Sequence, residues 1–311
     1  MFVLSHFLCN FGAMKLQKHE LSILIPIYNA SCVRLVKTLD EQARRLGISY
    51  EIIVADDSSP KRELTAPNEA IGQMEHCRYI VKEVNTGSAS NRNFLARQAQ
   101  YGWLLYVDCD LEISRDDFLG RYLSVMDEGV VSGGICIGGD PVELRHSLRY
   151  LYEKREEPNH TADHRQQRPY QSFRSCNFMV SREVMLRCPF DERFLRSGYE
   201  DVLLGKELKR QGVSITHIDN PVLMTDYEDN ASYVVKIERS LETLHQFRNE
   251  LRGYSRLQTL AEGIHVGAVR WLLKAGFKLT APMMRHNLSG RHPILKLFDL
   301  YRTGYYLSIN N

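Results

Sequence analysis

The sequence predicts an α/β fold with a mostly parallel sheet flanked by helices. Short apolar runs rich in β-branched residues alternate with amphipathic segments of helical spacing in the first half of the chain, and each run ends in polar residues. The 311 residues, 43% apolar and 25% charged, suit one large globular domain with an appendage. We expect an N-terminal extension at 1–14, which we interpret as not native, the α/β domain at 15–230 and a helical C-terminal extension at 231–311.

Four strands and two helices are expected in the first half. The apolar run from Leu21 predicts a strand with Pro26 near its exit, where a missing amide donor is tolerated. Ser31 is expected to cap the helix that follows, and Gly47 to end it. The expected strands are 21–27, 50–55, 78–83 and 103–107, and the expected helices are 31–46 and 91–101.

The pattern is looser after residue 110. The polar stretch 159–168 is expected to be a mobile loop. From about Ser232 onward, apolar residues recur at helical spacing. Further strands are expected at 130–137, 173–180 and 213–219, and further helices at 115–126, 145–157, 182–187 and 201–211.

Polar residues follow all four strands expected in the first half. Ligands of parallel sheets bind outside the carboxyl ends of the strands, so these side chains are expected at one edge although they are far apart in sequence. They are Tyr28 and Asn29, Asp56 and Asp57, Asn85 and Gly87, and Asp108 and Asp110.

Asp108 and Asp110 flank Cys109 directly after a buried strand. Alternation along an extended segment puts both carboxylates on one side, where two like charges are costly without a counter-charge. A hard divalent cation supplies one, and magnesium completes its shell with water and substrate phosphates. The pattern therefore indicates a metal–diphosphate site, although a helix cap or a solvated turn explains it equally well.

Two other acidic pairs also allow two interpretations. Asp56 and Asp57 open a good turn sequence, DDSSP, but at a strand end they could accept hydrogen bonds from a nucleobase or ribose. Asp201 could be a helix N-cap and Glu200 a partner of the helix dipole, or one of them could be a general base; the sequence slightly favours the cap. GxGxxG and GxxxxGK[ST] are absent, which argues against an NAD enzyme and excludes a P-loop.

The motifs taken together are more informative than each alone. LSILIPIYN, IIVADDSSP, VNTGSASNRN, LLYVDCD and GYED, in this order, resemble family 2 glycosyltransferases of the GT-A fold from about Leu21 to Asn230. FDERF and IDNPV, on either side of GYED, resemble non-processive bacterial members, particularly those that modify surface polysaccharides. The QxxRW signature of processive synthases is absent.

The resemblance implies a role for each site residue. Asp201 would be the base that activates the acceptor hydroxyl for direct inverting displacement, and Glu200 would position the acceptor. Asp110 would coordinate Mn²⁺ or Mg²⁺, and Asp108 would face the ribose or the metal. The residues implied for the nucleotide pocket are Pro26, Tyr28, Asn29, Asp56, Asp57, Gly87, Asn91, Arg92 and Asp108.

One position departs from the family pattern. Members of this kind often carry a histidine after IDNPV as a further metal ligand, where this chain has Met224. A thioether is a poor ligand for a hard cation. We interpret His217 as structural; Asp226 could replace the missing ligand, or the metal could rely on Asp110, phosphates and water.

The predicted function is a metal-dependent inverting glycosyltransferase. It would move one sugar from a nucleotide-diphosphate sugar, with a UDP-sugar favoured, to a glycan or lipid-linked acceptor in surface polysaccharide or glycan assembly. The alternative, motivated by Met224, is a non-catalytic family member that binds nucleotide sugar or glycan. A sugar-phosphate nucleotidyltransferase is disfavoured, because YNASC stands where that class would carry a Gly- and Arg-rich loop.

Charge and cysteine content bear on partners and compartment. The net charge of +2 offers no general attraction for nucleic acid, and seven cysteines without paired spacing indicate the reducing cytoplasm. Residues 265–311 carry seven Lys or Arg and one acid, Asp299. This tail could be an amphipathic surface that rests peripherally on the inner face of a membrane, or a packed helical appendage with a solvated basic face; the sequence modestly favours the second.

Overall fold

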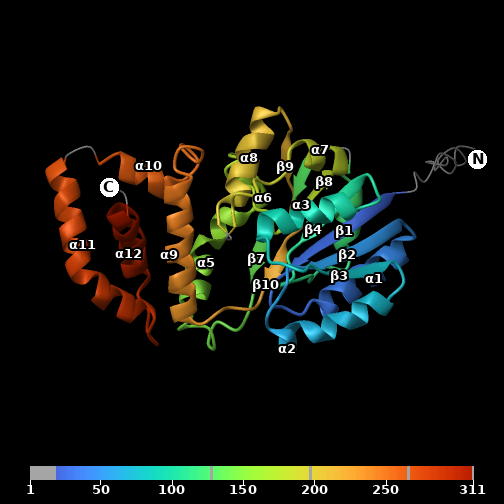
Figure 1. Ribbon diagram of the computed structural model, residues 1–311, viewed down its shortest axis with the longest axis horizontal. Helices are drawn as coiled ribbons and strands as arrows, with labels where there is room; N and C mark the ends of the chain where they lie inside the picture. Colours follow the sequence, from blue (N-terminus) through green and yellow to red (C-terminus); the bar gives the residue numbers. More distant parts are fainter. Residues whose placement is uncertain (1–18, 127–128, 196–197, 265–266, 310–311) are drawn as a thin grey trace, which may run out of the picture.

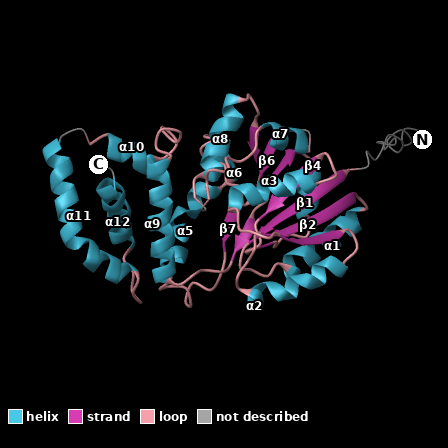
Figure 2. Cartoon of the chain, in the orientation of Figure 1, coloured by secondary structure: helices cyan, strands magenta, loops and turns pink. Residues whose placement is uncertain are grey.

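The computed structural model describes residues 19–126, 129–195, 198–264 and 267–309, so the extension predicted at 1–14 lies outside the described residues. A large sheet carries helices on both faces, and further helices extend from one end of this layered body (Figures 1 and 2). This arrangement confirms the α/β class.

The large sheet has the strand order β3-β2-β1-β4-β8-β6-β9. The four neighbours from β3 to β4 are parallel, and β8 pairs antiparallel with β4. A smaller sheet has the order β5-β10-β7. The strands of the large sheet are β1 Glu20–Ile27, β2 Ser49–Asp56, β3 Cys77–Val81, β4 Trp103–Val107, β6 Val130–Ser132, β8 Asn177–Ser181 and β9 Ile215–His217, and those of the small sheet are β5 Leu111–Glu112, β7 Ile135–Ile137 and β10 Val222–Met224.

The helices differ widely in length. Those over the large sheet or beside it are α1 Val33–Leu46, α2 Arg62–Thr65, η1 Ala66–Gln73, α3 Ser88–Gln98, α4 Phe118–Leu123, α5 Leu148–Glu156, η2 Glu157–His160, α6 Ala162–Gln166, α7 Arg182–Arg187 and α8 Glu200–Arg210. Those that follow are α9 Asn230–Gln246, α10 Arg256–Glu262, α11 Gly267–Leu288 and α12 Leu295–Ile309.

The core lies in two apolar layers, one on each face of the large sheet. Successive side chains of a strand point to opposite faces, so Ile23 and Ile25 of β1 pack on the side of α1, while Leu24 packs on the side of α3. Pro26 lies beyond Leu24, the last β1 residue paired with β4, so its missing amide hydrogen leaves no gap in that ladder.

The start of α1 differs from the prediction, whereas its end does not. Gly47 ends the helix in the left-handed conformation at φ 63°, as expected. Ser31 is not the N-cap: Cys32 holds that position without a side-chain cap. Asn68 of η1 accepts from the Cys32 backbone amide at 2.9 Å, so a side chain distant in sequence holds the residue at which the helix begins.

Two further expectations are wrong. The strand predicted at 130–137 divides into β6 and β7, because Gly134 turns the chain at φ 86°. The loop predicted at 159–168 is largely helical, as η2 and α6. The buried guanidinium of Arg165 donates to the carbonyls of Ser132, Gly133 and Ile218 at 2.8–3.2 Å. These bonds hold the polar segment against the large sheet.

The helical extension predicted at 231–311 corresponds to α9, α10, α11 and α12, at the left of Figure 1. Its own apolar cluster includes Tyr233 of α9, Leu288 of α11 and Phe298 of α12, together with Leu148 of α5. Leu148 ties the extension to the sheet-bearing part. Among the described helices, none is both long and apolar enough to cross a membrane.

Candidate functional site

The strand register brings the predicted polar residues to one edge of the large sheet. Ile27 of β1 lies opposite Asp56 of β2, and Asp56 lies opposite Val81 of β3, so the three strands end level with one another. β4 is parallel to β1 and ends just before Asp108. The turns after these four strands therefore form a continuous polar rim.

Asp56 orders the turn after β2. Its side chain is fully buried, and its two carboxylate oxygens accept from the Ser59 amide and from the Tyr79 hydroxyl, each at 2.9 Å. The Asn29 backbone amide donates to the Ser59 hydroxyl at 2.7 Å, and the Asn29 side-chain oxygen Oδ1 accepts from the Lys61 backbone amide at 3.1 Å. Asp56 and Asn29 thus join the turns after β1 and β2.

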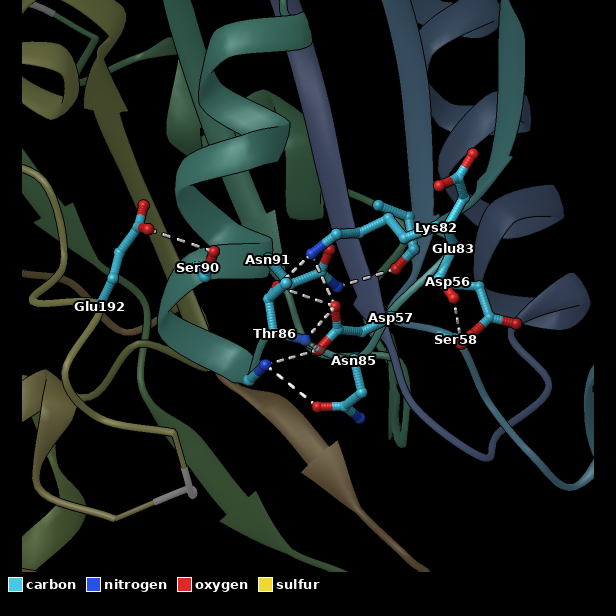
Figure 3. A network of polar contacts seen from close by, with 12 residues as sticks. Asp56, Asp57, Ser58, Lys82, Glu83, Asn85, Thr86, Ser90, Asn91 and Glu192 are labelled. Carbon is cyan, nitrogen blue, oxygen red and sulfur yellow. Dashed lines mark hydrogen bonds and ion pairs between the residues drawn. The ribbon is translucent and has the colours of Figure 1, made fainter.

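Asp57 holds the turn that precedes α3 (Figure 3). Its carboxylate accepts from Lys82 Nζ at 2.6 Å, from the Thr86 amide at 3.0 Å and from the Gly87 amide at 2.8 Å. Asn91 adds a bond to the sheet by donating to the Ala55 carbonyl at 2.9 Å. The charge of Asp57 is therefore neutralised inside the protein by Lys82.

Gly87 allows this turn to approach the segment before GYED. It has φ 86°, and a Cβ at this position would lie 2.7 Å from the Leu195 carbonyl oxygen. Because only glycine combines that backbone conformation with such a close approach, the turn after β3 packs directly against the chain that leads to Glu200.

Tyr28 is the apolar element of the rim. Its side chain is 51% exposed, directly after β1, whereas Asp56 and Asp57 are buried. The ring therefore offers an accessible flat surface beside the polar turns. Pro26, two residues earlier, is half-buried.

Arg92 of α3 connects the two acidic motifs. Its side chain is 6% exposed, its Nη2 donates to Asp108 Oδ1 at 2.6 Å, and its Nη1 lies 3.8 Å from Glu200 Oε1. The ring of Phe190 lies 5.6 Å from the guanidinium. Nε and Nη1 are buried without a hydrogen-bond partner among the described residues, so the arginine has donors to spare.

Asp108 and Asp110 fit a hard divalent cation in part. Burial raises the pKa of Asp108, and the Arg92 guanidinium opposes that rise. Asp110 is exposed and makes no hydrogen bond or ion pair within the described part of the chain. No third Asp, Glu, His or Cys there joins them in a metal-binding group. Two carboxylates would leave the remaining ligands to phosphate oxygens and water, as Mg²⁺ tolerates.

Met224 is part of the apolar core. Its side chain is buried, and β10 pairs it with Leu111, the residue after Asp110. Position 224 therefore lies beside β5, directly after Asp110, but its side chain belongs to the apolar layer. Asp226, two residues later, is exposed.

His217 is structural, as predicted. It is buried, its Nδ1 lies 2.6 Å from Arg165 Nη1, and its Nε2 lies 2.9 Å from the Pro169 carbonyl oxygen. Burial lowers its pKa to about 4, against the hydrogen bond to Pro169. A neutral ring that accepts at Nδ1 and donates at Nε2 satisfies both partners.

Glu200 and Asp201 begin α8 but do not cap it. The N-cap is Tyr199, at φ 69°, so the expectation that Asp201 is the cap is wrong. Glu200 folds back, and its oxygens accept from the Gly198 amide at 2.6 Å and the Ser88 hydroxyl at 3.0 Å. Burial, and then the charge of Glu200, raise the pKa of Asp201 to about 6.

Two arginines that no sequence motif indicated interact electrostatically with the candidate carboxylates, Arg149 with Asp110 and Arg174 with Asp201. Arg149 pairs with the carboxylate of Glu228, and its pKa is raised because the charges of Glu228 and then Asp110 outweigh the effect of burial. Arg174 is held 3.8 Å from Glu153 and acts electrostatically on Asp201. In sequence, Arg149 is one charge among many in a charged helix, and only the packing of α5 distinguishes it.

Comparisons with known proteins agree with this geometry. The family model described as "Glycosyl transferase family 2" matches residues 22–188. A protein of Haemophilus influenzae described as an "Uncharacterized glycosyltransferase" is 33% identical over 92 residues, which span 29% of this chain and 29% of that relative.

Solved structures resemble the chain over most of its length. S. aureus TarS 1–349 superposes with a TM-score of 0.50 at 16% identity, over 93% of this chain and 90% of that chain. Mannosyltransferase PcManGT from Pyrobaculum calidifontis, in complex with GDP-Man and Mn²⁺, superposes with a TM-score of 0.51 at 13% identity, over 92% and 84% of the two chains. At these identities the likeness shows the fold, which is that of GT-A glycosyltransferases.

Proposed function

This chain belongs to glycosyl transferase family 2, and we propose on that premise that it moves a single sugar from a nucleotide-diphosphate sugar to an acceptor hydroxyl, with inversion and with a divalent metal. The observation that carries the proposal is the position of Arg92. Its buried guanidinium contacts Asp108 at 2.6 Å and lies 3.8 Å from Glu200, so the implied donor end and the implied acceptor end form one site.

The donor would lie along the rim of the large sheet. Tyr28, with its exposed ring, would stack on the nucleobase. Asp56 and Asp57, which are engaged inside the protein, would shape the pocket by holding its turns rather than by offering free carboxylates. Asn29, Gly87 and Asn91 would likewise shape the pocket through the hydrogen bonds that fix these turns.

Asp108 and Asp110 would hold Mn²⁺ or Mg²⁺, which when bound offsets the charge of the diphosphate leaving group. Arg149, which is paired with Glu228, interacts electrostatically with Asp110 and would moderate the negative charge of this turn.

Asp201 would be the general base. It would take the proton from the acceptor hydroxyl while that oxygen bonds to the anomeric carbon and the bond to the diphosphate oxygen breaks on the opposite face. A carboxylate with a raised pKa is a stronger base than an ordinary aspartate, and burial of Asp201 supports this assignment. Glu200, with both oxygens engaged, would position the acceptor loop.

The decisive experiment compares the wild type with Asp201→Asn. Donor binding is measured by thermal shift with UDP-, GDP-, CMP- and dTDP-sugars, with and without Mn²⁺, starting from UDP-sugars. Turnover is measured with the donors that bind. We expect Asp201→Asn to keep the shift and to lose about 100-fold or more in kcat.

A second candidate is a non-catalytic family member that binds nucleotide sugar or glycan. The buried Met224 in place of a ligand favours it. Donor binding by a wild type that turns over none of the donors, with glycan acceptors supplied, would favour this candidate. The absence of a shift with every donor, with or without metal, would count against the enzyme and against a nucleotide-sugar binder, and would leave a glycan binder to be tested with glycans.

The cellular role that suits this activity is surface polysaccharide or glycan assembly on the cytoplasmic side of the membrane, with a glycan or lipid-linked acceptor. Radiolabelled sugar transferred to a lipid-extractable product would support the lipid-linked acceptor. Label that stays in the aqueous phase would support a soluble glycan.

A further inference from the structure

Helix α11 presents an apolar side to the outside of the molecule. Leu272, Leu279 and Met283 are 61%, 83% and 68% exposed. Their spacing of seven and four residues places them on one side of a helix with 3.6 residues per turn. Among the described residues of α11, only Leu288 is buried. An apolar stripe of this kind in water is a sign of an interaction surface.

The stripe widens toward the start of the helix. Trp271 is 67% exposed, and Val269 and Leu273 are 45% exposed. Tryptophan is favoured at membrane interfaces, because its large ring is apolar and its N–H is polar. We call the six side chains together the α11 face: Val269, Trp271, Leu272, Leu273, Leu279 and Met283.

The charge of α11 has a single sign. Its sequence GAVRWLLKAGFKLTAPMMRHNL holds four Lys or Arg and no Asp or Glu. Lys278 is exposed, and so are Arg291 and Lys296 in the segment that follows. The acid of this tail, Asp299, is paired with Arg155 at 2.7 Å on the side of α5. The α11 face is therefore bordered by positive charge.

A groove between α11 and α12, on the side of α11 away from Leu272 and Leu279, has an apolar wall and a basic edge. Its volume is about 540 Å³, and Phe277, Ala281, Pro282 and Tyr301 line it together with Lys274, Lys278 and Arg285. Glu238 holds the Arg285 guanidinium at 2.9 Å, so this cation is oriented before any ligand arrives. The cations of the groove therefore lie on the side of α11 that would face the lipid headgroups when the apolar stripe is buried.

The position of α11 leaves this face accessible. In Figure 1, α12 lies between α11 and α9, and α11 is the outermost helix, at the end of the molecule away from the large sheet. No described helix is apolar enough to span a bilayer, so a lipid contact through α11 would lie in the interface plane.

We propose that the α11 face rests on an anionic lipid bilayer, with the Lys278 groove at the level of the lipid phosphates. A second copy of the chain is the competing occupant. The basic border decides against it, because two identical faces of one charge sign repel each other when they meet. The proposal stands on the extension alone and does not depend on the glycosyltransferase activity.

The test is vesicle flotation of the full chain. Vesicles of phosphatidylcholine alone are compared with vesicles of equal parts phosphatidylcholine and phosphatidylglycerol, at low and high salt. We expect the wild type to float with the anionic vesicles only, and the bound fraction to fall several-fold at high salt because screening weakens the contact.

Two sets of variants identify the surface. Leu272→Glu with Leu279→Glu should reduce the bound fraction about tenfold or more, whereas Val142→Glu, at a similarly exposed apolar residue elsewhere, should not change it. Lys278→Glu with Lys296→Glu should weaken binding to anionic vesicles, whereas Lys37→Glu on α1 should have no effect. All six substituted positions are exposed, so thermal midpoints should stay within about 2 °C of the wild type.

Several results would overturn the proposal. These are a wild type that does not float with anionic vesicles, a Leu272→Glu/Leu279→Glu protein that floats as well as the wild type, and a wild-type dimer that this double substitution converts to monomer without any vesicle binding. Donor thermal shifts recorded on the same samples separate failure of the lipid contact from failure of the proposed activity.

Discussion

The Arg92 guanidinium donates to the Asp108 carboxylate at 2.6 Å with its side chain almost fully enclosed. Removing one partner of such a pair leaves a charge in a poorly solvated site, which costs more than the loss of an exposed pair. The contact therefore serves the stability of the fold as well as the geometry of the site.

Arg92→Met should lower the free energy of unfolding by about 3 kcal/mol, because Asp108 and Glu200 would keep their charges without a counter-charge. Urea unfolding followed by circular dichroism measures this loss. Arg97→Met on the same helix is the control: Arg97 is exposed and lies 3.5 Å from Glu192, so its loss should cost less than about 1 kcal/mol. Equal losses in the free energy of unfolding for the two substitutions would show that the buried pair stabilises the fold no more than the exposed pair.

Gly87→Ala should weaken both folding and donor binding. A Cβ at φ 86°, 2.7 Å from the Leu195 carbonyl oxygen, strains the turn and pushes it away from the chain before GYED. We expect a loss of about 2 kcal/mol in stability and a donor affinity that is lower by about tenfold. Gly72→Ala, with no atom within 4 Å of the added Cβ and no positive φ, should change neither quantity. An unchanged Gly87→Ala protein would contradict the packing of this turn.

The pH profile of kcat should follow Asp201. A base must be deprotonated, so kcat should rise with pH through about 6 and then level off, well above the range of an ordinary aspartate near 3.9. The same raised pKa means that the folded state binds the proton more tightly than the unfolded state. The stability from this group is therefore present at low pH and is lost as pH rises through the folded pKa. Asp201→Asn should consequently be no less stable than the wild type at pH 7. An acidic limb near pH 4 would argue against Asp201 as the base.

Metal removal should separate the candidate ligands. Chelation by EDTA should abolish turnover, and Mn²⁺ or Mg²⁺ should restore it. Asp110→Ala should raise the Mn²⁺ concentration for half-maximal activity by at least about tenfold. Asp226→Ala should leave it unchanged, because Asp226 is exposed and Asp108 and Asp110 provide both protein carboxylates in our assignment. A larger effect at Asp226 than at Asp110 would exchange their roles.

Much of the fold follows from local pattern. The runs before Asp57 and Asp108 predicted β2 and β4 to within one residue at each end, because strands buried on both faces are continuous in their apolar character. The ends of such strands meet at one edge by topology, so the region of the site was also predictable. The polar stretch 159–168 was misjudged, because the buried bonds of Arg165 lie to residues far away in sequence.

The roles of individual acidic residues could not be predicted as well from the sequence. Whether Asp56 faces a ligand or a neighbouring turn depends on Tyr79 and Ser59, and no local pattern encodes that choice. Asp201 has good N-cap chemistry, yet Tyr199 takes the cap position at a positive φ. Arg149 pairs with Glu228 and interacts electrostatically with Asp110, and neither partner is near it in sequence.

The sequence by itself determined the α/β class, the family and the polar rim where we place the candidate site, because apolar periodicity and short motifs are local properties of the chain. Only the tertiary structure decided that Arg92 joins Asp108 to Glu200, that Met224 is buried in the core, and that α11 turns its apolar side outward. Each of these depends on which distant segment packs against a side chain, and burial and charge pairing arise only when those segments meet.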